Sequence, residues 1–269
     1  MTKREYAQEI ADIINGEVTE IRKNNGVIKT GIQRKEEGSN VSAIIYVDDM
    51  YDEGFDIDEA AEKIDELLKE NSHPDLSVEV DDLTNYESMK GKLTLQLFNE
   101  RKNIYDVKKS AKEYGFDDLI IVPVVVLGRT ANGTTGFKVT NEMLKKWGVS
   151  AEQVFADAEA QISQDDYTIV SMAKIMAEMM GIDVENIPDN GMMVVTNREK
   201  CNGAYGVIAL REQLRQRFPD GYIVIPSSIH ECIVHPLIDT VDVDSWVNEV
   251  NDSCVDDTEV LGHKAYRIM

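Results

Sequence analysis

The run LIIVPVVVL (residues 119–127) is the longest apolar stretch of the chain and decides its class of fold. Its nine residues fall far short of the roughly 20 that a membrane-spanning helix needs, so the run is expected to form a buried β-strand. Because Pro123 has no N–H to donate to a neighbouring strand, we expect it at a sheet edge or at a bulge. The chain is therefore expected to fold around a sheet.

Strand and turn signals lie on both sides of this run. Leu93, Leu95 and Leu97 alternate with polar residues, as in a half-buried strand. An Asn-Gly pair at 132–133 favours a tight turn into a strand at 134–139. Later apolar segments predict strands at 192–195, 204–210, 222–225 and 229–234, and a helix at 211–217. Since hairpins are mixed with helices, the predicted fold class is α+β, with mixed, mostly antiparallel sheets and packed amphipathic helices.

Capping signals predict where several helices begin. Thr2, Asp56 and Ser150 are each followed three residues later by Glu or Gln, which is the spacing of a capping box. A further helical pattern comes from apolar residues that recur at helical spacing, namely Ile169, Met172, Ile175, Met176 and Met179. We interpret this methionine-rich stripe as flexible core filling rather than an adaptable binding groove.

The chain of 269 residues is long enough for one large domain or two ordinary ones. We expect residues 1–110 to form a helix and a small antiparallel sheet with an acidic helix. Residues 111–269 are expected to form an α+β subdomain that carries the segments VVTN, NGA and IPSSIHE. The boundary is soft, between about residues 108 and 114, and a single domain stays an alternative.

The charge of the chain is strongly acidic and unevenly placed. Against 28 Lys and Arg stand 50 Asp and Glu, a net charge of -22, so direct binding to nucleic acid or to an anionic membrane is not expected. Residues 48–87 hold sixteen acids and two bases, and residues 239–259 hold eight acids and no base. These stretches are either solvated faces that keep the protein in solution or one acidic surface that contacts a basic protein.

The cysteines and histidines predict no cofactor. Cys201, Cys232 and Cys254 are odd in number and lack CxxC spacing, so we expect reduced thiols and a cytoplasmic protein. His230 and His235 are five residues apart, which places their rings on opposite faces of a strand and not together as in a zinc-protease motif. No metal site is expected from this spacing.

The segment directly after the apolar run YIVIP (222–226) holds the main candidate site. Ser227, Ser228, His230 and Glu231 form a compact polar group there. In one interpretation a hydroxyl, an imidazole and a carboxylate converge for acid-base work. In the other they form a turn in which serine binds local backbone groups and His230 pairs with Glu231.

A second polar loop extends the candidate site. Asn197 and Asn202 flank a charged loop between two apolar segments, and Asn tolerates the left-handed conformations that tight loops require. This loop is either a plain hairpin connection or part of a polar cluster with Ser227 and His230.

The order of motifs along the chain resembles one family. The segments IQRKEEGSNVSAIIYVDDMYDEG (32–54), KLTLQLFNERKN (92–103), LIIVPVVVL (119–127), NEMLKKWGVSAEQVF (141–155), MMVVTNREKCNGA (192–204) and YIVIPSSIHECIVHP (222–236) are similar to the bacterial family called domain of unknown function 5688. The resemblance spans nearly the whole chain and implies a cytoplasmic protein of anaerobic Firmicutes, but no reaction. Carried over residue by residue, the matching polar positions are Asn197, Asn202, Ser227, Ser228, His230 and Glu231.

Taken together, these patterns favour a non-catalytic binding or regulatory module. One alternative is a hydrolase-like enzyme of small molecules that uses Ser227, His230 and Glu231. A second alternative is an acidic mimic of nucleic acid that binds a basic nucleic-acid-binding protein through residues 48–87 and 239–259. The sequence leaves open whether the protein is an enzyme.

Overall fold

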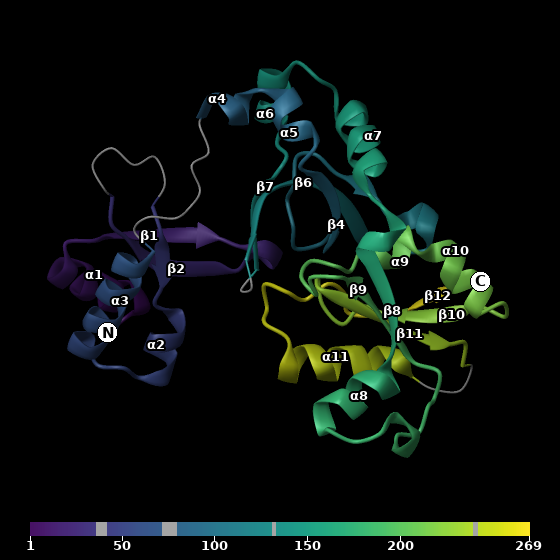
Figure 1. The fold of residues 1–269 in the computed structure, drawn as a ribbon. Coiled ribbons are helices and arrows are strands. Elements are labelled where there is room, and N and C mark those ends of the chain that lie inside the picture. Colours follow the sequence, from purple (N-terminus) through teal and green to yellow (C-terminus); the bar gives the residue numbers. More distant parts are fainter. Residues whose placement is uncertain (36–41, 72–79, 131–132, 239–241) are drawn as a thin grey trace. The chain divides into compact units, whose positions relative to one another are not determined.

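The computed structural model describes residues 1–35, 42–71, 80–130, 133–238 and 242–269 (Figure 1). Contacts divide the chain into two compact units, Met1–Val78 and Glu79–Met269. Helices occur with three sheets whose strand pairs are antiparallel, which confirms the α+β class. The expected domains 1–110 and 111–269 stay a prediction. Among the described residues, no helix is both long enough and apolar enough to cross a membrane.

The first unit is a three-stranded sheet with helices packed on it. Its elements are α1 (Lys3–Ile14), β1 (Glu17–Arg22), η1 (Asn24–Gly26), β2 (Ile28–Gln33), β3 (Ile44–Tyr46), α2 (Asp48–Glu53) and α3 (Ile57–Glu70). The strands lie in the order β1-β2-β3. The apolar faces of α1 and α3 and the buried side of β2 form one hydrophobic cluster.

The helices begin where the capping signals predict. The Thr2 hydroxyl accepts from the Glu5 N–H, and the Glu5 carboxylate accepts from the Thr2 N–H. The Asp56 carboxylate accepts from the Glu59 N–H at the start of α3. Each bond satisfies an amide that the first helical turn leaves without a partner.

The second unit opens with a four-stranded sheet. Its elements are α4 (Val80–Thr84), α5 (Tyr86–Lys90), β4 (Leu93–Asn99), β5 (Lys109–Ser110), η2 (Lys112–Tyr114), β6 (Leu119–Thr130), β7 (Gly133–Lys138), α6 (Asn141–Trp147) and α7 (Ala151–Gln161). The strand β6 is the apolar run of the sequence, and it pairs with β4 on one side and with β5 and β7 on the other.

The expectation that Pro123 marks a sheet edge or a bulge is wrong. Pro123 pairs with Leu95 of β4 inside the sheet, and the irregularity of β6 lies further on, between Val126 and Gly128. Its carbonyl accepts from the Val139 N–H, so its backbone faces the side where β5 has ended and β7 begins. The position where Pro123 lacks an N–H therefore lies in the gap between β5 and β7, where no partner strand requires a hydrogen bond from it.

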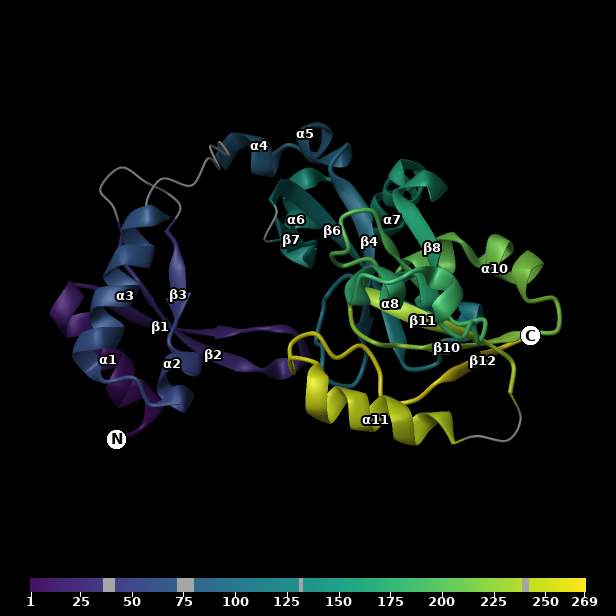
Figure 2. The same cartoon turned by 60° about the horizontal axis from the view of Figure 1, so that its bottom comes forward.

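A five-stranded sheet follows, in the order β12-β10-β11-β9-β8. Its elements are η3 (Gln164–Asp166), β8 (Tyr167–Ser171), α8 (Met172–Met180), η4 (Val184–Asn186), β9 (Met193–Asn197), α9 (Gly206–Ala209), α10 (Arg211–Arg217), β10 (Tyr222–Ile225), β11 (Glu231–Pro236), α11 (Val243–Cys254) and β12 (Tyr266–Ile268). The helix α11 lies alongside this sheet in both views (Figures 1 and 2). Buried residues of both sheets belong to one continuous core.

The strand expected at 204–210 is wrong, because that segment is a turn followed by the short helix α9. The helix packs closely on the sheet at Gly206. A Cβ on this residue would lie 2.9 Å from the ring of Tyr167 in β8 and 3.0 Å from the side chain of Val195 in β9. An apolar run this short satisfies burial as either a strand or a helix, so its periodicity does not decide between them.

Candidate functional site

His230 lies in the connection between β10 and β11, where both of its ring nitrogens have partners. The Asn202 N–H donates to Nδ1 at 2.9 Å, and Nε2 lies 3.1 Å from Oε1 of Glu259. Because a backbone amide can only donate, Nδ1 is the acceptor and the proton of the neutral ring is on Nε2, where it points to the carboxylate. The ring thus connects two segments that are distant in sequence.

The backbone of His230 is held as firmly as its ring. Its N–H donates to the Ser228 hydroxyl at 3.1 Å. Its carbonyl accepts from the Thr196 hydroxyl at 2.8 Å and from the Gly203 N–H at 3.0 Å. A Cβ on Gly203 would lie 2.3 Å from the Asn197 nitrogen and 2.8 Å from this carbonyl, so the close approach requires glycine.

Asn197 and Asn202 shape the loop that reaches His230. The side chain of Asn197 donates to the Cys201 carbonyl at 2.6 Å and accepts from the Cys201 N–H at 2.9 Å, which closes the loop. Lys200 and Asn202 have φ values of 54° and 53°, the left-handed region. The side-chain nitrogen of Asn202, Nδ2, donates to the Thr134 hydroxyl at 3.0 Å and so links the loop to β7 of the other sheet.

The structure brings together four of the six candidate residues. Asn197, Asn202, Ser228 and His230 belong to one hydrogen-bond network. Ser227 donates its N–H to the carbonyl of Ile225, and among the described residues its hydroxyl has no partner. Glu231 begins β11 opposite Thr196, and the carboxylate at the His230 ring is that of Glu259 instead.

The candidate residues named from the sequence do not include four other members of the network, namely Thr134, Thr196, Cys201 and Glu259. Thr196 carried a usable signal, because it stands at the polar end of the apolar strand beside Asn197. Glu259 lies in the acidic stretch 239–259, where nothing in the neighbouring sequence distinguishes it from the other acids.

This geometry does not assemble a nucleophile with a base. A serine or cysteine nucleophile requires a ring nitrogen that accepts its proton, and both nitrogens of His230 are engaged. Cys232 is buried, and burial raises the pKa of its thiol well above its ordinary value. Across the described ranges no three His, Cys, Asp or Glu side chains lie together as a metal site would require.

Asn197 also lines a cavity of about 490 Å³ between the two sheets of the second unit, together with Thr94, Leu127, Asp166 and Tyr167. Asn202, Ser227 and His230 are not among the residues that line it. The polar network and this cavity therefore share one residue, and the network does not converge on the cavity.

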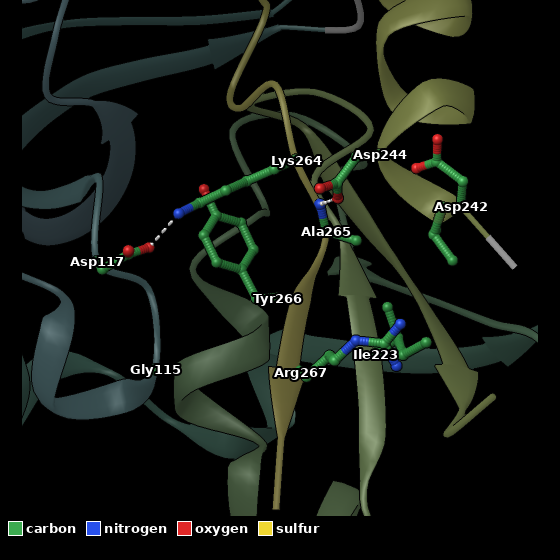
Figure 3. A pocket seen from close by; sticks show the side chains of 10 residues that line it. Gly115, Asp117, Ile223, Asp242, Asp244, Lys264, Ala265, Tyr266 and Arg267 are labelled. Atoms are coloured by element: carbon green, nitrogen blue, oxygen red, sulfur yellow. Dashed lines mark hydrogen bonds and ion pairs between the residues drawn. The ribbon is translucent and has the colours of Figure 1, made fainter. Parts of the chain in front are cut away.

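A charged cavity of about 470 Å³ lies between the first turn of α11, strand β12 and the loop before β6 (Figure 3). On one wall Nζ of Lys264 lies 2.6 Å from Oδ1 of Asp117. This hydrogen bond raises the pKa of Lys264 and lowers the pKa of Asp117. Lys264 is therefore protonated at neutral pH and does not serve there as a general base or a nucleophile.

Two other polar groups of this cavity, Asp244 and Tyr266, hold β12 in place. Asp244 accepts from the Ala265 N–H at 2.7 Å, as the dashed line in Figure 3 marks. The Tyr266 hydroxyl donates to Asp118 at 2.6 Å, and burial, with this bond, raises the pKa of Tyr266. These contacts have a structural role.

The interpretation of the methionine-rich stripe as core filling is wrong for Met176 and Met179, whereas Ile169 packs against the core and Met172 and Ile175 are half-buried. The helix α8 buries only small residues, Ala173 and Ala177. Met176, Met179 and Met180 on α8 are exposed, Met179 by 83%. With Ile182 and Val184 of the following turn, these residues are called the methionine surface below. Of the twelve large apolar side chains exposed in the described part of the chain, five are in this surface.

The segment that carries the methionine surface is an insertion between paired strands. Residues 172–192 connect β8 to β9, which pair from Tyr167 with Asn197 to Ser171 with Met193. Strands so paired need a loop of only about two to five residues, so this connection, which contains α8 and η4, is much longer than the pairing requires. Figure 1 shows α8 projecting from the end of β8 on the side away from the four-stranded sheet.

Comparison with protein families matches the chain to the family of unknown function DUF5688 over residues 2–268. No curated protein and no solved structure matches the chain. The resemblance found in the order of the sequence motifs is thus confirmed over nearly the full length.

Proposed function

We propose that this chain, which belongs to the DUF5688 family of unknown function, is a non-catalytic module that binds another protein through the methionine surface. The observation that carries the proposal is the exposure of Met176, Met179 and Met180 on a helix that buries only alanines. A contiguous exposed apolar patch is costly in water and commonly marks a site of interaction. Flexible thioether side chains adapt to the shape of a partner.

The polar network supports the non-catalytic part of the proposal. The hydrogen bonds of His230 to Asn202 and Glu259 join the segment before β11, the loop after β9 and the segment after α11. A hydrolase that used Ser227, His230 and Glu231 would have to break one of these bonds before the ring could take up a proton. We therefore assign the network a scaffold role. The three cysteines, which form no disulfide, agree with a role in the cytoplasm.

A photo-crosslinking residue placed at Met179 tests the proposal in cells that produce the protein naturally. The matched control is the same residue at Arg217, an exposed position at the end of α10. We expect one protein to be joined from position 179 and not from position 217. That protein, once purified, should bind the wild-type chain and lose at least about tenfold in affinity when Met176, Met179 and Met180 are changed to Ser.

Equal crosslinking from both positions, or unchanged affinity of the triple variant, would show that the methionine surface is not the binding site. The fold of each variant is checked by tryptophan fluorescence during urea unfolding. Both tryptophans, Trp147 and Trp246, are in the second unit, so the signal reports on the unit that holds α8.

A further inference from the structure

The charges around the methionine surface indicate what kind of partner fits it. Glu178, Asp183, Glu185 and Asp189 are all exposed. Lys174 is the single Lys or Arg of residues 172–192, and its Nζ lies 3.9 Å from Oε1 of Glu178. The apolar side chains are thus accompanied by a clear excess of negative charge. This excess lies outside the two acidic stretches 48–87 and 239–259.

We infer that the methionine surface binds a basic amphipathic helix of another protein. This inference rests on the proposed function and names the class of partner. The apolar face of such a helix would cover Met176, Met179 and Met180, and its Lys or Arg side chains would face the surrounding carboxylates.

The shape of the surface favours a helix as the partner. Met176, Met179 and Met180 have the i, i+3, i+4 spacing that gives one face of a helix, and the nine residues of α8 are about 14 Å long. Two helices pack along such faces at about 8–10 Å between their axes. The helix ends at Gly181, whose φ of 65° turns the chain so that Ile182 and Val184 follow at the same end.

The same charges disfavour two other occupants. An anionic lipid surface would be repelled by the four carboxylates. A second copy of this chain would bring the acids of both copies together, because an interface between identical surfaces is symmetric. A basic helix removes both the exposed apolar area and the uncompensated charge.

A designed peptide tests the inference on the full chain. The probe is a synthetic helix of about 18 residues with Leu on one face and Lys on the other, and its matched control has Glu in place of every Lys. We expect the Lys peptide to bind at least about tenfold more tightly than the Glu peptide. Its affinity should fall as salt is raised from 0.1 M to 1 M, because the Debye length falls from about 10 Å to about 3 Å.

Two variants locate the binding and separate the two proposals. Changing Glu178, Asp183, Glu185 and Asp189 to their amides should weaken binding of the Lys peptide by about tenfold. The matched control neutralises four exposed acids of α3 in the other unit, namely Asp58, Glu59, Glu62 and Glu66, and should leave the affinity unchanged.

Three outcomes would contradict the inference of a basic helix. If the Glu peptide binds as well as the Lys peptide, or if the α3 variant weakens binding as much as the α8 variant, the inference of a basic helix is wrong. The proposed function survives that result if the crosslinked protein still requires the methionines. If sedimentation shows a dimer of the chain that the Met→Ser variant dissociates, the occupant is a second copy and the inference is overturned.

Discussion

Replacing His230 by Ala should destabilise the second unit by about 2 kcal/mol. The substitution removes the acceptor of the Asn202 N–H, and a partly buried donor left without a partner costs about 1–3 kcal/mol. Loss of the bond to Glu259 adds only about 0.5 kcal/mol. That carboxylate is 41% exposed, so water can take the place of the ring. The loss therefore comes chiefly from one amide.

Urea unfolding followed by tryptophan fluorescence measures this loss. With a denaturant dependence of about 2 kcal/mol per molar urea, a loss of 2 kcal/mol lowers the unfolding midpoint by about 1 M. Because Trp147 and Trp246 are both in the second unit, unfolding of the first unit does not contribute to the signal.

Two control variants identify the bond responsible. Asn202→Gly keeps the backbone N–H that binds the ring and suits the φ of 53°, so it should cost less than about 1 kcal/mol despite the lost bond to Thr134. Glu259→Gln keeps an oxygen that accepts from Nε2 and should cost less than about 0.5 kcal/mol. If His230→Ala is as stable as the wild type, or if Asn202→Gly costs as much as His230→Ala, the amide–imidazole bond does not hold this scaffold.

Two further substitutions test the packing and the charges of the second unit. Gly203→Ala should lower the free energy of unfolding by about 2 kcal/mol or more in the same assay, because the added Cβ would clash with backbone atoms. The control is Gly91→Ala, whose Cβ would have no atom within 4 Å, and it should change stability by less than about 0.5 kcal/mol. Hydrogen bonds, chiefly from the Tyr86 hydroxyl, lower the pKa of Asp157, so its contribution is present above the unfolded pKa of about 3.9 and is lost as the pH falls through the lower folded value. Asp157→Asn should therefore lower the free energy of unfolding at pH 7 and have the same stability as the wild type in acid. The control Asp220→Asn, at an exposed position, should be as stable as the wild type at both pH values. A stability difference between Asp157→Asn and the wild type that persists in acid would contradict this account.

Features that depend on neighbours in the chain were predictable from the sequence. The starts of α1, α3 and α7 follow from hydrogen bonds between residues three apart, at Thr2, Asp56 and Ser150. The ranges 211–217 and 222–225 were likewise expected as a helix and a strand, and they are α10 and β10. Such signals are local, so the sequence alone contains the interactions that produce them.

Only part of the candidate site was predictable from such local signals. His230, Asn197 and Asn202 are polar residues at the ends of apolar strands, which the sequence shows directly. The partners of the His230 ring come from segments far away in the chain, with Asn202 28 residues before it. Only the antiparallel pairing of β9 with β11 brings the loop after β9 to this ring.

The sequence by itself determined the α+β class, the local helix starts and the acidic character of this protein. The tertiary structure alone decided that 204–210 is not a strand, that Pro123 lies inside a sheet and that Met176, Met179 and Met180 of α8 are exposed. Periodicity shows that one face of a segment is apolar, but not whether another element covers that face. For α8 the small side chains of Ala173 and Ala177 are buried against the unit, and the larger Met176, Met179 and Met180 are left in solvent.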